Sequence, residues 1–418
     1  MELGQQQAEA EEDILRWYEG PEQVYYLGGW AGTGKTSLAS RLASKLVGLE
    51  KTAFAAYTGK AALRLRELGC PNASTIHSWI YHSRENSRQM LLDIKEELQE
   101  LVGELQAEGV DVAELADHPK VQHLEGLIAR EEKVARRPIF SLNPLSQVKD
   151  LPLSVLDEVS MVTDEMRQHW CSFGRKTLVL GDPFQLPPVG GEGAFTSQKP
   201  NYMLTQIHRQ AEGNPIIALA SSIRGLEYPR PKDWGNGTRV LAKSDLNPTM
   251  LRNIVVNSDQ IIVGKNETRH SYNNRIRTLL GHKGRWPNVG EKVVCLRNNH
   301  ELGILNGALY TVVNDPDVYE DIERIDMILE PVGGGNQVEV HAHTHHFVGK
   351  EDQLKKAWFS KKEAEEFDFG YALTCHKTQG SQYKNPVIFD ESYIAKQFRY
   401  QWLYTATTRA QESATLIV

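Results

Sequence analysis

A glycine-rich segment that ends in a lysine and a threonine carries the clearest chemistry in this sequence. Residues Gly29–Thr36 read Gly-Trp-Ala-Gly-Thr-Gly-Lys-Thr and match the phosphate-loop pattern G-x-x-x-x-G-K-[ST]. Glycines let backbone N–H groups surround phosphates, Lys35 offers a positive charge to the β and γ oxygens, and the Thr36 hydroxyl suits Mg²⁺. Because an apolar run precedes this segment and a helix-like run follows it, we expect a nucleoside triphosphate to bind here.

Two adjacent carboxylates form a candidate second half of the same site. Asp157 and Glu158 directly follow the apolar run Leu153–Leu156, where a buried strand would end. Asp-Glu pairs are common on surfaces, but beside a phosphate loop and after a buried strand they favour Mg²⁺-dependent hydrolysis. We expect Asp157 to hold Mg²⁺ through water and Glu158 to polarise the attacking water. Gln185, after the next apolar strand, would lie at the same sheet edge and sense the γ-phosphate.

The elements that must position these residues follow an α/β pattern. Residues 24–80 alternate apolar strands with helical segments, and further apolar runs occur at 153–156, 177–180 and 260–263. This alternation is typical of parallel sheets covered by helices. We therefore expect two α/β domains, the first of which holds the phosphate loop.

Two segments break this pattern and predict insertions. From Leu91, apolar residues step by three and four positions among Glu and Lys, and a second stripe begins at Val121. These stripes predict an antiparallel helical hairpin, for which a solvated structural arm is the simplest role. Between residues 285 and 369, short strands separated by Asn-Gly and Gly-Gly turns predict a small β-barrel.

The predicted domain organisation follows from these changes of pattern. We expect a first α/β domain over residues 1–83 and 138–200, interrupted by the helical hairpin 84–137. We expect a second α/β domain over residues 201–284 and 370–418, interrupted by the barrel 285–369.

Composition narrows the class of protein. The chain has 418 residues, of which 40% are hydrophobic and 24% charged, as in globular proteins of several domains. Its net charge of −7 argues against broad electrostatic coating of nucleic acid, but it is compatible with binding through a local basic groove of the protein. Four scattered cysteines and no membrane-length apolar run favour a reducing cytoplasm. His341–His346 contains four histidines, which we interpret as a polar strand face rather than a metal site.

Eight motifs, in order along nearly the whole chain, resemble those of superfamily 1B DNA helicases of the RecD/Dda branch. The phosphate loop and Leu156-Asp157-Glu158-Val159-Ser160-Met161-Val162 are two of them. The others are Tyr57-Thr58-Gly59-Lys60-Ala61-Ala62, Ser74-Thr75-Ile76-His77, Gly181-Asp182-Pro183-Phe184-Gln185-Leu186-Pro187-Pro188, Leu204-Thr205-Gln206-Ile207-His208-Arg209-Gln210, Ala372-Leu373-Thr374-Cys375-His376-Lys377-Thr378-Gln379-Gly380 and Tyr404-Thr405-Ala406-Thr407-Thr408-Arg409-Ala410.

This resemblance implies that ATP lies between two RecA-like domains, with a helical insertion in the first and an SH3-like β-barrel in the second. Arg209 and Arg409 match arginine-finger positions, which stabilise the charge on the γ-phosphoryl group only when the cleft closes. Gln7 resembles an upstream glutamine that reads adenine, although Gln5 and Gln6 compete for this role. The implied ATP-binding residues are Gln7, Gly29, Ala31, Gly32, Thr33, Gly34, Lys35, Thr36 and Ser37; the implied catalytic residues are Lys35, Thr36, Asp157, Glu158, Gln185, Arg209 and Arg409.

The same resemblance implies contacts with single-stranded DNA through hydroxyls, backbone amides and basic side chains, which suit phosphates. The strand-separating pin of this branch would lie in the interval that the helical hairpin mostly fills. We therefore take residues 138–150 as the candidate pin, with Phe140 as its wedge, and the hairpin as a docking arm for a protein partner. The implied DNA-binding residues are Thr58, Gly59, Lys60, Thr75, His77, Lys265, Asn266, Thr374, His376 and Lys377.

Taken together, the resemblance implies an ATP-dependent helicase that moves 5′→3′ on single-stranded DNA and unwinds forked duplex as a monomer. ATP is the expected substrate and Mg²⁺ the expected cofactor. Three alternatives stay open: a translocase that displaces proteins with weak unwinding, a phosphate-loop ATPase that regulates a protein partner, and an RNA helicase. Trp30, a bulky ring at a free position of the loop, has no explanation in the sequence.

Overall fold

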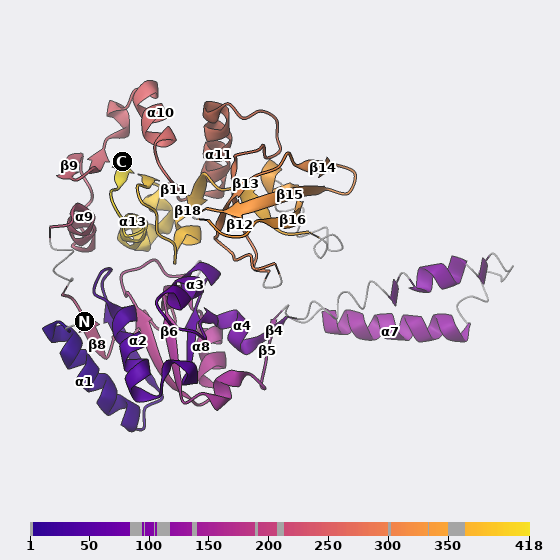
Figure 1. Ribbon diagram of the computed structural model, residues 1–418, viewed down its shortest axis with the longest axis horizontal. Helices are drawn as coiled ribbons and strands as arrows, with labels where there is room; N and C mark the ends of the chain where they lie inside the picture. Colours follow the sequence, from indigo (N-terminus) through magenta and orange to yellow (C-terminus); the bar gives the residue numbers. More distant parts are fainter. Residues whose placement is uncertain are drawn as a thin grey trace. The chain divides into compact units, whose positions relative to one another are not determined.

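The computed structural model describes residues 3–83, 94–95, 97–103, 105–106, 118–135, 140–188, 191–206, 213–299, 302–332, 334–349 and 364–418. The chain divides into two compact units, one of Met1–Trp79 with Gln147–Val418 and the other of Ile80–Ser146 (Figure 1). Across the described residues, every helix is too short or too polar to cross a membrane.

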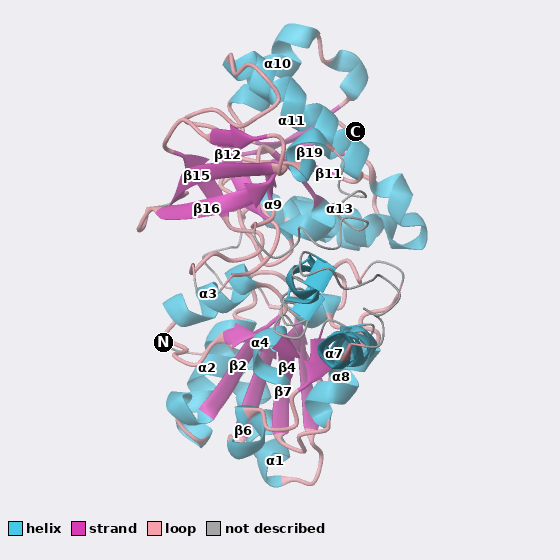
Figure 2. Ribbon diagram, turned by 90° about the vertical axis from the view of Figure 1, so that its right-hand side faces the viewer, coloured by secondary structure: helices cyan, strands magenta, loops and turns pink. Residues whose placement is uncertain are grey.

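The first sheet has six parallel strands in the order β3-β2-β6-β7-β1-β8. Their carboxyl ends therefore lie at one edge, where ligands bind in open parallel sheets. The strands are β1 (Val24–Gly29), β2 (Thr52–Ala56), β3 (Ser74–Thr75), β6 (Leu153–Asp157), β7 (Lys176–Gly181) and β8 (Tyr202–Leu204). The accompanying helices are α1 (Gln5–Glu19), α2 (Lys35–Leu46), α3 (Gly59–Glu67), α4 (Ile76–Ile80) and α8 (Asp164–Cys171), drawn in cyan around the magenta strands in Figure 2.

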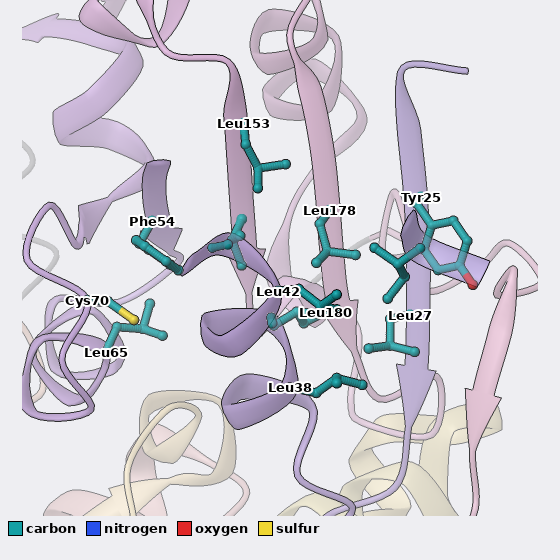
Figure 3. Close-up of a cluster of buried hydrophobic side chains, with 14 of the residues drawn as sticks. Tyr25, Leu27, Leu38, Leu42, Phe54, Leu65, Cys70, Leu153, Leu178 and Leu180 are labelled. Atoms are coloured by element: carbon teal, nitrogen blue, oxygen red, sulfur yellow. The ribbon is translucent and has the colours of Figure 1, made fainter. Parts of the chain in front are cut away.

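Apolar side chains of α2 hold the phosphate-loop helix on this sheet. Leu38 and Leu42 face Leu27, Leu178 and Leu180 across the helix–sheet interface, and all five are almost completely buried (Figure 3). Each buried leucine contributes roughly 1.5–3 kcal/mol through the hydrophobic effect. The start of α2, which carries the lysine of the loop, is thereby fixed at the carboxyl edge of β1.

The second sheet has six strands in the order β18-β11-β19-β20-β10-β9, all parallel except β9. Its strands are β9 (Lys232–Gly235), β10 (Thr238–Leu241), β11 (Ile261–Val263), β18 (Ala372–Thr374), β19 (Val387–Phe389) and β20 (Thr415–Ile417). Its helices are α9 (Pro215–Arg224), α10 (Pro248–Val256), α11 (Asn266–Leu280) and α13 (Arg399–Thr407). The predicted α/β class with parallel sheets is therefore confirmed.

The segment predicted as a barrel forms an antiparallel sheet in the order β14-β15-β13-β12-β17, with β16 paired to the long strand β15. A bridge between Ala342 of β16 and Glu365, just before β17, joins the two sides of this sheet. The strands are β12 (Lys292–Cys295), β13 (Leu309–Val312), β14 (Asp317–Tyr319), β15 (Arg324–Pro331), β16 (Val338–His343) and β17 (Phe367–Phe369). Its likeness to an SH3 barrel stays a prediction.

The second unit contains the two-stranded sheet of β4 (Tyr81–Ser83) and β5 (Phe140–Leu142), and the helix α7 (Pro119–Ala135). Residues 97–103 are also helical, and Leu98, Leu101, Val102 and Leu105 pack against Val121 of α7. The two predicted apolar stripes therefore face each other.

The structure corrects two of the predicted boundaries. Tyr202–Leu204, placed in the second domain by the boundary at residue 200, pair with Leu27–Gly29 and extend the first sheet. Tyr81–Ser83 and Phe140–Leu142, placed in the first domain, pair only with each other among the described strands and belong to the second unit. In both cases pairing between distant strands decided the boundary, and this pairing leaves no local signal in the sequence.

Candidate nucleotide-binding site

The phosphate loop connects β1 to α2 through backbone that only glycine adopts easily. Gly34 caps α2 with a φ of 77°, in the left-handed region, so a side chain there would be strained. The Lys35 ammonium donates to the carbonyls of Gly29 at 2.6 Å and Trp30 at 3.1 Å. Thr33 lies behind the loop, where its hydroxyl donates to the Trp30 carbonyl at 2.9 Å. Gly29 and Thr33 thus shape the loop rather than line its mouth.

The expected metal site brings Thr36 and Asp157 together. The Thr36 hydroxyl donates to Asp157 Oδ2 at 2.8 Å, and the Glu158 N–H donates to Asp157 Oδ1 at 2.8 Å. Burial, and next the neighbouring Glu158 carboxylate, raise the pKa of Asp157 to about 6. A hydroxyl and a carboxylate are the hard oxygen donors that Mg²⁺ prefers, with water and phosphate completing its shell. The donor set therefore fits Mg²⁺, while no group of three His, Cys, Asp or Glu side chains converges in the described part of the chain.

A cavity of about 1120 Å³ opens beside the loop and is lined by both sheets. From the first sheet and its helices it receives Gln7, Ala31, Gly32, Gly34, Lys35, Thr36, Ser37, Asp157, Glu158 and Gln185, all of them predicted, together with Arg64, Leu65, Leu68, Leu204 and Gln206. From the second sheet it receives Gly380, Gln382, Thr408 and Arg409. This volume accommodates a nucleotide, because small-molecule sites typically enclose ~300–1,000 Å³.

Contacts of α1 distinguish the three neighbouring glutamines. Gln7 is 6% exposed, and its amide donates to the Thr33 carbonyl at 3.1 Å, so it is bound to the back of the phosphate loop. Gln6 accepts from the N–H groups of Thr205 and Gln206, both at 2.8 Å, at the end of β8. Gln5 donates to Glu9 on the surface of its own helix. All three line the cavity, and of the three only Gln7 joins the helix to the loop. Its role as the nucleotide-contacting glutamine stays a prediction.

Of the two predicted arginine fingers, the structure describes one. Arg409 is 4% exposed, lines the cavity, and donates to the carbonyls of Thr405 at 3.1 Å and Ser381 at 3.4 Å. These bonds hold the guanidinium at the cavity, on the side of the second sheet. Arg209 lies outside the described residues, and its role stays a prediction.

A buried polar bridge that the sequence reasoning did not find connects the two sheets. The Ser160 hydroxyl donates to Gln185 Oε1 at 3.2 Å. From the second sheet, Gln379 Nε2 reaches the same hydroxyl at 3.5 Å and donates to the Leu186 carbonyl at 2.8 Å. Gln185 is thus joined to the motif at residues 372–380. Ser160 and Gln379 both belong to motifs quoted above, but their types alone gave no reason to single them out.

A second bridge, also missed, starts from Tyr404 of α13. Its hydroxyl donates to Asp182 Oδ2 at 2.6 Å and accepts from the Ala31 N–H at 3.2 Å. Burial raises the pKa of both Asp182 and Tyr404. Leu186 N–H further donates to the Thr405 hydroxyl at 2.8 Å. Tyr404 belongs to one of the eight motifs, but its residue type alone gave no reason to single it out.

The predicted DNA-contacting residues of the first sheet gather at the start of α3. Thr58 caps this helix and Lys60 lies with its ammonium 5.2 Å from the Tyr383 ring centroid, where burial lowers its pKa. Two glycines allow close approach of neighbouring segments here. A Cβ atom added at Gly59 would lie 2.9 Å from Leu305, and one added at Gly380 would lie 2.6 Å from the Thr58 hydroxyl, so neither position has space for a side chain. The start of α3 therefore meets both the 372–380 motif and the segment between β12 and β13.

The corresponding residues of the second sheet follow its adjacent strands β11 and β18. Val263 and Thr374 are register partners at the ends of these strands. Lys265 and His376, each two residues further along the chain, therefore follow the sheet at neighbouring points. The Lys265 ammonium lies 4.9 Å from the Tyr393 ring centroid, and Asn266 begins α11. Burial lowers the pKa of His376, as it does that of His77, while a bond to the Pro187 backbone opposes this shift at His376. Lys377 is exposed on the short 3-10 helix Cys375–Thr378, which also carries His376.

The geometry corrects two predictions. Thr75 is 2% exposed and its hydroxyl accepts from the Ser78 N–H at 3.1 Å, so it caps α4 instead of facing a DNA phosphate. The histidines at 341–346 are not one polar face: His343 is buried, which lowers its pKa to about 4, and His345 and His346 are buried beside Glu323 and Glu366. The side chain of Phe140, the predicted wedge, lies outside the described residues.

Comparison with known protein families gives two matches. Residues 2–227 match a family described as an AAA domain, and residues 369–417 match the UvrD-like helicase C-terminal domain. The ATP-dependent RecD2 DNA helicase of Deinococcus radiodurans is 24% identical, over 97% of this chain and 48% of its own. The ATP-dependent DNA helicase Pif1 of a Psychrobacter species is 26% identical, over 51% of this chain and 41% of its own. The chain therefore spans about half the length of the curated relatives it matches.

Solved Pif1 structures share the fold. Pif1 helicase from Candida albicans superposes with a TM-score of 0.53 at 16% identity, covering 100% of this chain and 94% of its own. Bacteroides Pif1 bound to single-stranded DNA gives a TM-score of 0.52 at 17% identity, covering 99% and 92%. At this identity the likeness shows the fold alone, that of RecA-like phosphate-loop helicase domains.

Proposed function

Because the chain belongs to the superfamily 1B family of RecD/Pif1-like DNA helicases, we propose that it is an ATP-dependent helicase that moves 5′→3′ on single-stranded DNA. The observation that carries this proposal is the cavity lined by both sheets. Lys35, Thr36 and Asp157 enter it from one side, and Arg409 from the other. A site divided in this way completes itself only when the two sheets approach, which couples hydrolysis to movement.

Each residue has a separate part in the proposed hydrolysis. Lys35 holds the β and γ oxygens, while Thr36 and Asp157 hold Mg²⁺, which neutralises phosphate charge when bound. Glu158 orients and polarises the attacking water. Arg409 stabilises the charge that spreads over the γ-phosphoryl oxygens, and Arg209 is the proposed second finger.

The route from this site to DNA runs through the buried bridge. Gln185 is bonded to Ser160, and Ser160 is in contact with Gln379 of the 372–380 motif, which also carries Thr374, His376 and Lys377. Gly380 of this motif packs against Thr58 at the start of α3. A shift of the motif on hydrolysis would therefore move both groups of proposed DNA contacts relative to each other.

The domain division and partners are proposed on the same grounds. The two parallel sheets are the proposed RecA-like domains, and the antiparallel sheet of 285–369 is the proposed SH3-like insertion that helps to hold the strand. Single-stranded and forked DNA are the proposed partners of a monomer, in the cytoplasm. Residues 84–137 are the proposed docking arm for a protein.

A forked-duplex unwinding assay tests the proposal. Duplexes with only a 5′ tail, only a 3′ tail or both are mixed with the protein, ATP and Mg²⁺, and release of the labelled strand is measured. We expect unwinding of the 5′-tailed and forked duplexes and none of the 3′-tailed one, with Lys35→Ala inactive on all three. Unwinding from the 3′ tail alone would contradict the proposed polarity.

A translocase with weak unwinding is the second candidate. It is favoured by the pin region, where β4 and β5 pair over three residues each and the insertion separates them. The same substrates distinguish it when one 5′-tailed strand carries a streptavidin block. A translocase would displace streptavidin from single-stranded DNA without releasing the duplex strand.

A further inference from the structure

Trp30 places a large aromatic ring on the phosphate loop, in contact with the second sheet domain. The guanidinium carbon of Arg224 lies 4.3 Å from the centroid of its ring. Arg224 is the last residue of α9, which belongs to the second sheet domain. At this distance the cation and the ring face attract each other, so the pair joins the loop to α9.

The backbone of the same residue is bound into the loop. The Trp30 carbonyl accepts from the Lys35 ammonium at 3.1 Å and from the Thr33 N–H at 3.3 Å. Its N–H donates to the Leu204 carbonyl at 3.2 Å. The residue that Arg224 contacts is therefore one of the two whose carbonyls hold the phosphate-binding lysine.

The next loop residue makes a parallel contact. The Ala31 N–H donates to the Tyr404 hydroxyl of α13. Helices α9 and α13 share one buried cluster, in which Leu219 and Ile223 pack with Leu403 and Tyr404. Because close-packed cores move as units, α9 and α13 meet Trp30 and Ala31 as one body.

Binding of a triphosphate acts on these two residues directly. To reach the β and γ oxygens, the Lys35 ammonium must exchange its bond to the Trp30 carbonyl for phosphate. The loop N–H groups, that of Ala31 among them, are also phosphate donors in such loops. The position of the Trp30 ring on Arg224 is thus sensitive to what the loop holds.

We propose that Trp30 and Arg224 are a positioning pair that reports phosphate-loop occupancy to the second sheet domain and holds Arg409 at the cavity. Neither side chain bonds the nucleotide in this proposal, which rests on the ATPase activity proposed above. The pair acts on the transition state through Arg409, so its loss lowers kcat and leaves KM for ATP nearly unchanged.

The test is steady-state ATP hydrolysis with single-stranded DNA, measured for the wild type, Arg224→Ala, Trp30→Ala and the double variant. A cation–aromatic pair at a partly exposed site is worth roughly a 2- to 5-fold factor. We expect each single variant to lower kcat by at least this factor, and the double variant to be no worse than either. Arg224→Lys, which keeps a cation over the ring, should restore most of kcat.

A matched control comes from another pair in the same domain. Lys232 lies 4.3 Å from the Trp234 ring centroid on β9, away from the cavity, so Lys232→Ala should leave kcat unchanged. An effect of Arg224→Ala confined to KM would overturn the proposal, because the ring or the arginine would then contact the nucleotide itself. Multiplicative effects in the double variant would also overturn it.

Tryptophan fluorescence separates failure of this inference from failure of the proposed ATPase. Addition of ATP with Mg²⁺ should change the emission of the wild type and of Trp234→Phe, but not that of Trp30→Phe. This signal needs binding and no turnover, so it decides the inference even in a protein that does not hydrolyse ATP. A change in the emission of Trp30→Phe as large as that of the wild type would contradict the proposed movement of the ring.

Discussion

The two parallel sheets contribute to the cavity in different ways. The first sheet supplies consecutive loops at the ends of its own strands, and their polar atoms bond one another, as Lys35 does with Gly29 and Thr36 with Asp157. The second sheet supplies single side chains, Arg409 and Gln382 among them, from segments hundreds of residues away along the chain. In the proposed mechanism the first sheet therefore has the complete set for binding a triphosphate, whereas turnover depends on the second. Substitutions on the two sides should separate binding from turnover.

The largest loss is expected on the binding side. Lys35→Ala should lower kcat/KM for ATP by about 10³-fold, because the lysine serves both the bound triphosphate and the charge of the transition state. Binding of a fluorescent ATP analogue measures the loss of affinity for the triphosphate, and ATP turnover measures the loss of kcat. Lys51→Ala, an exposed lysine before β2, is the matched control and should behave as the wild type. Tight analogue binding by Lys35→Ala would remove the assignment of binding to the first sheet.

On the turnover side, Arg409→Lys should lower kcat by about 10²-fold with little change in KM. Lysine keeps the charge but loses the planar fork that donates to several oxygens at once. Arg399→Lys, at the start of α13 and outside the cavity, is the control. A loss of ATP affinity equal to the loss of kcat would place Arg409 with the binding residues and erase the contrast between the sheets.

Tyr404→Phe should have a smaller effect on turnover and a measurable one on stability. It leaves the buried Asp182 carboxylate without the phenol donor, which costs about 1–3 kcal/mol in the free energy of unfolding. We also expect kcat to fall several-fold because the Ala31 contact is lost. Urea unfolding and ATP turnover measure the two effects, with Tyr400→Phe on the same helix as control. Unchanged stability would show that Asp182 finds another partner.

The smallest effect is expected at the bridge between the sheets. Ser160→Ala removes the hydroxyl that donates to Gln185 and meets Gln379, each at the long end of hydrogen-bond distances. We expect the basal ATPase rate to stay within about 2-fold, while its stimulation by single-stranded DNA falls by about 3-fold. Ser172→Ala, whose hydroxyl bonds a carbonyl on the surface, is the control. Full stimulation in Ser160→Ala would mean that DNA is sensed by another route.

How much of the structure can be predicted from the sequence depends on how far apart along the chain the interacting residues lie. The phosphate loop is contiguous, so the residues 29–37 could be recognised from their spacing alone, and the apolar runs before them predicted the parallel strands. The Tyr404–Asp182 contact joins positions 222 residues apart and the Gln379–Leu186 contact positions 193 apart. Neither pair has a local pattern, because the packing of two sheets brings it together.

The errors have the same origin. Thr75 has the residue type of a phosphate contact, but its backbone position at the start of α4 gives its hydroxyl a capping role. Tyr202–Leu204 was placed in the second domain because a short strand of three residues has no periodicity of its own. Trp30 had no explanation until α9 placed Arg224 against its ring.

The central claim is that nucleotide turnover requires both sheets and is coupled to DNA. The measurement that tests it most directly is the steady-state ATPase rate of the wild type with and without a single-stranded oligonucleotide, at saturating ATP and Mg²⁺. We expect strong stimulation by the oligonucleotide, absent in Lys35→Ala and nearly absent in Arg409→Lys. An ATPase rate that is unchanged by DNA would contradict it and would favour a phosphate-loop ATPase that acts on a protein partner.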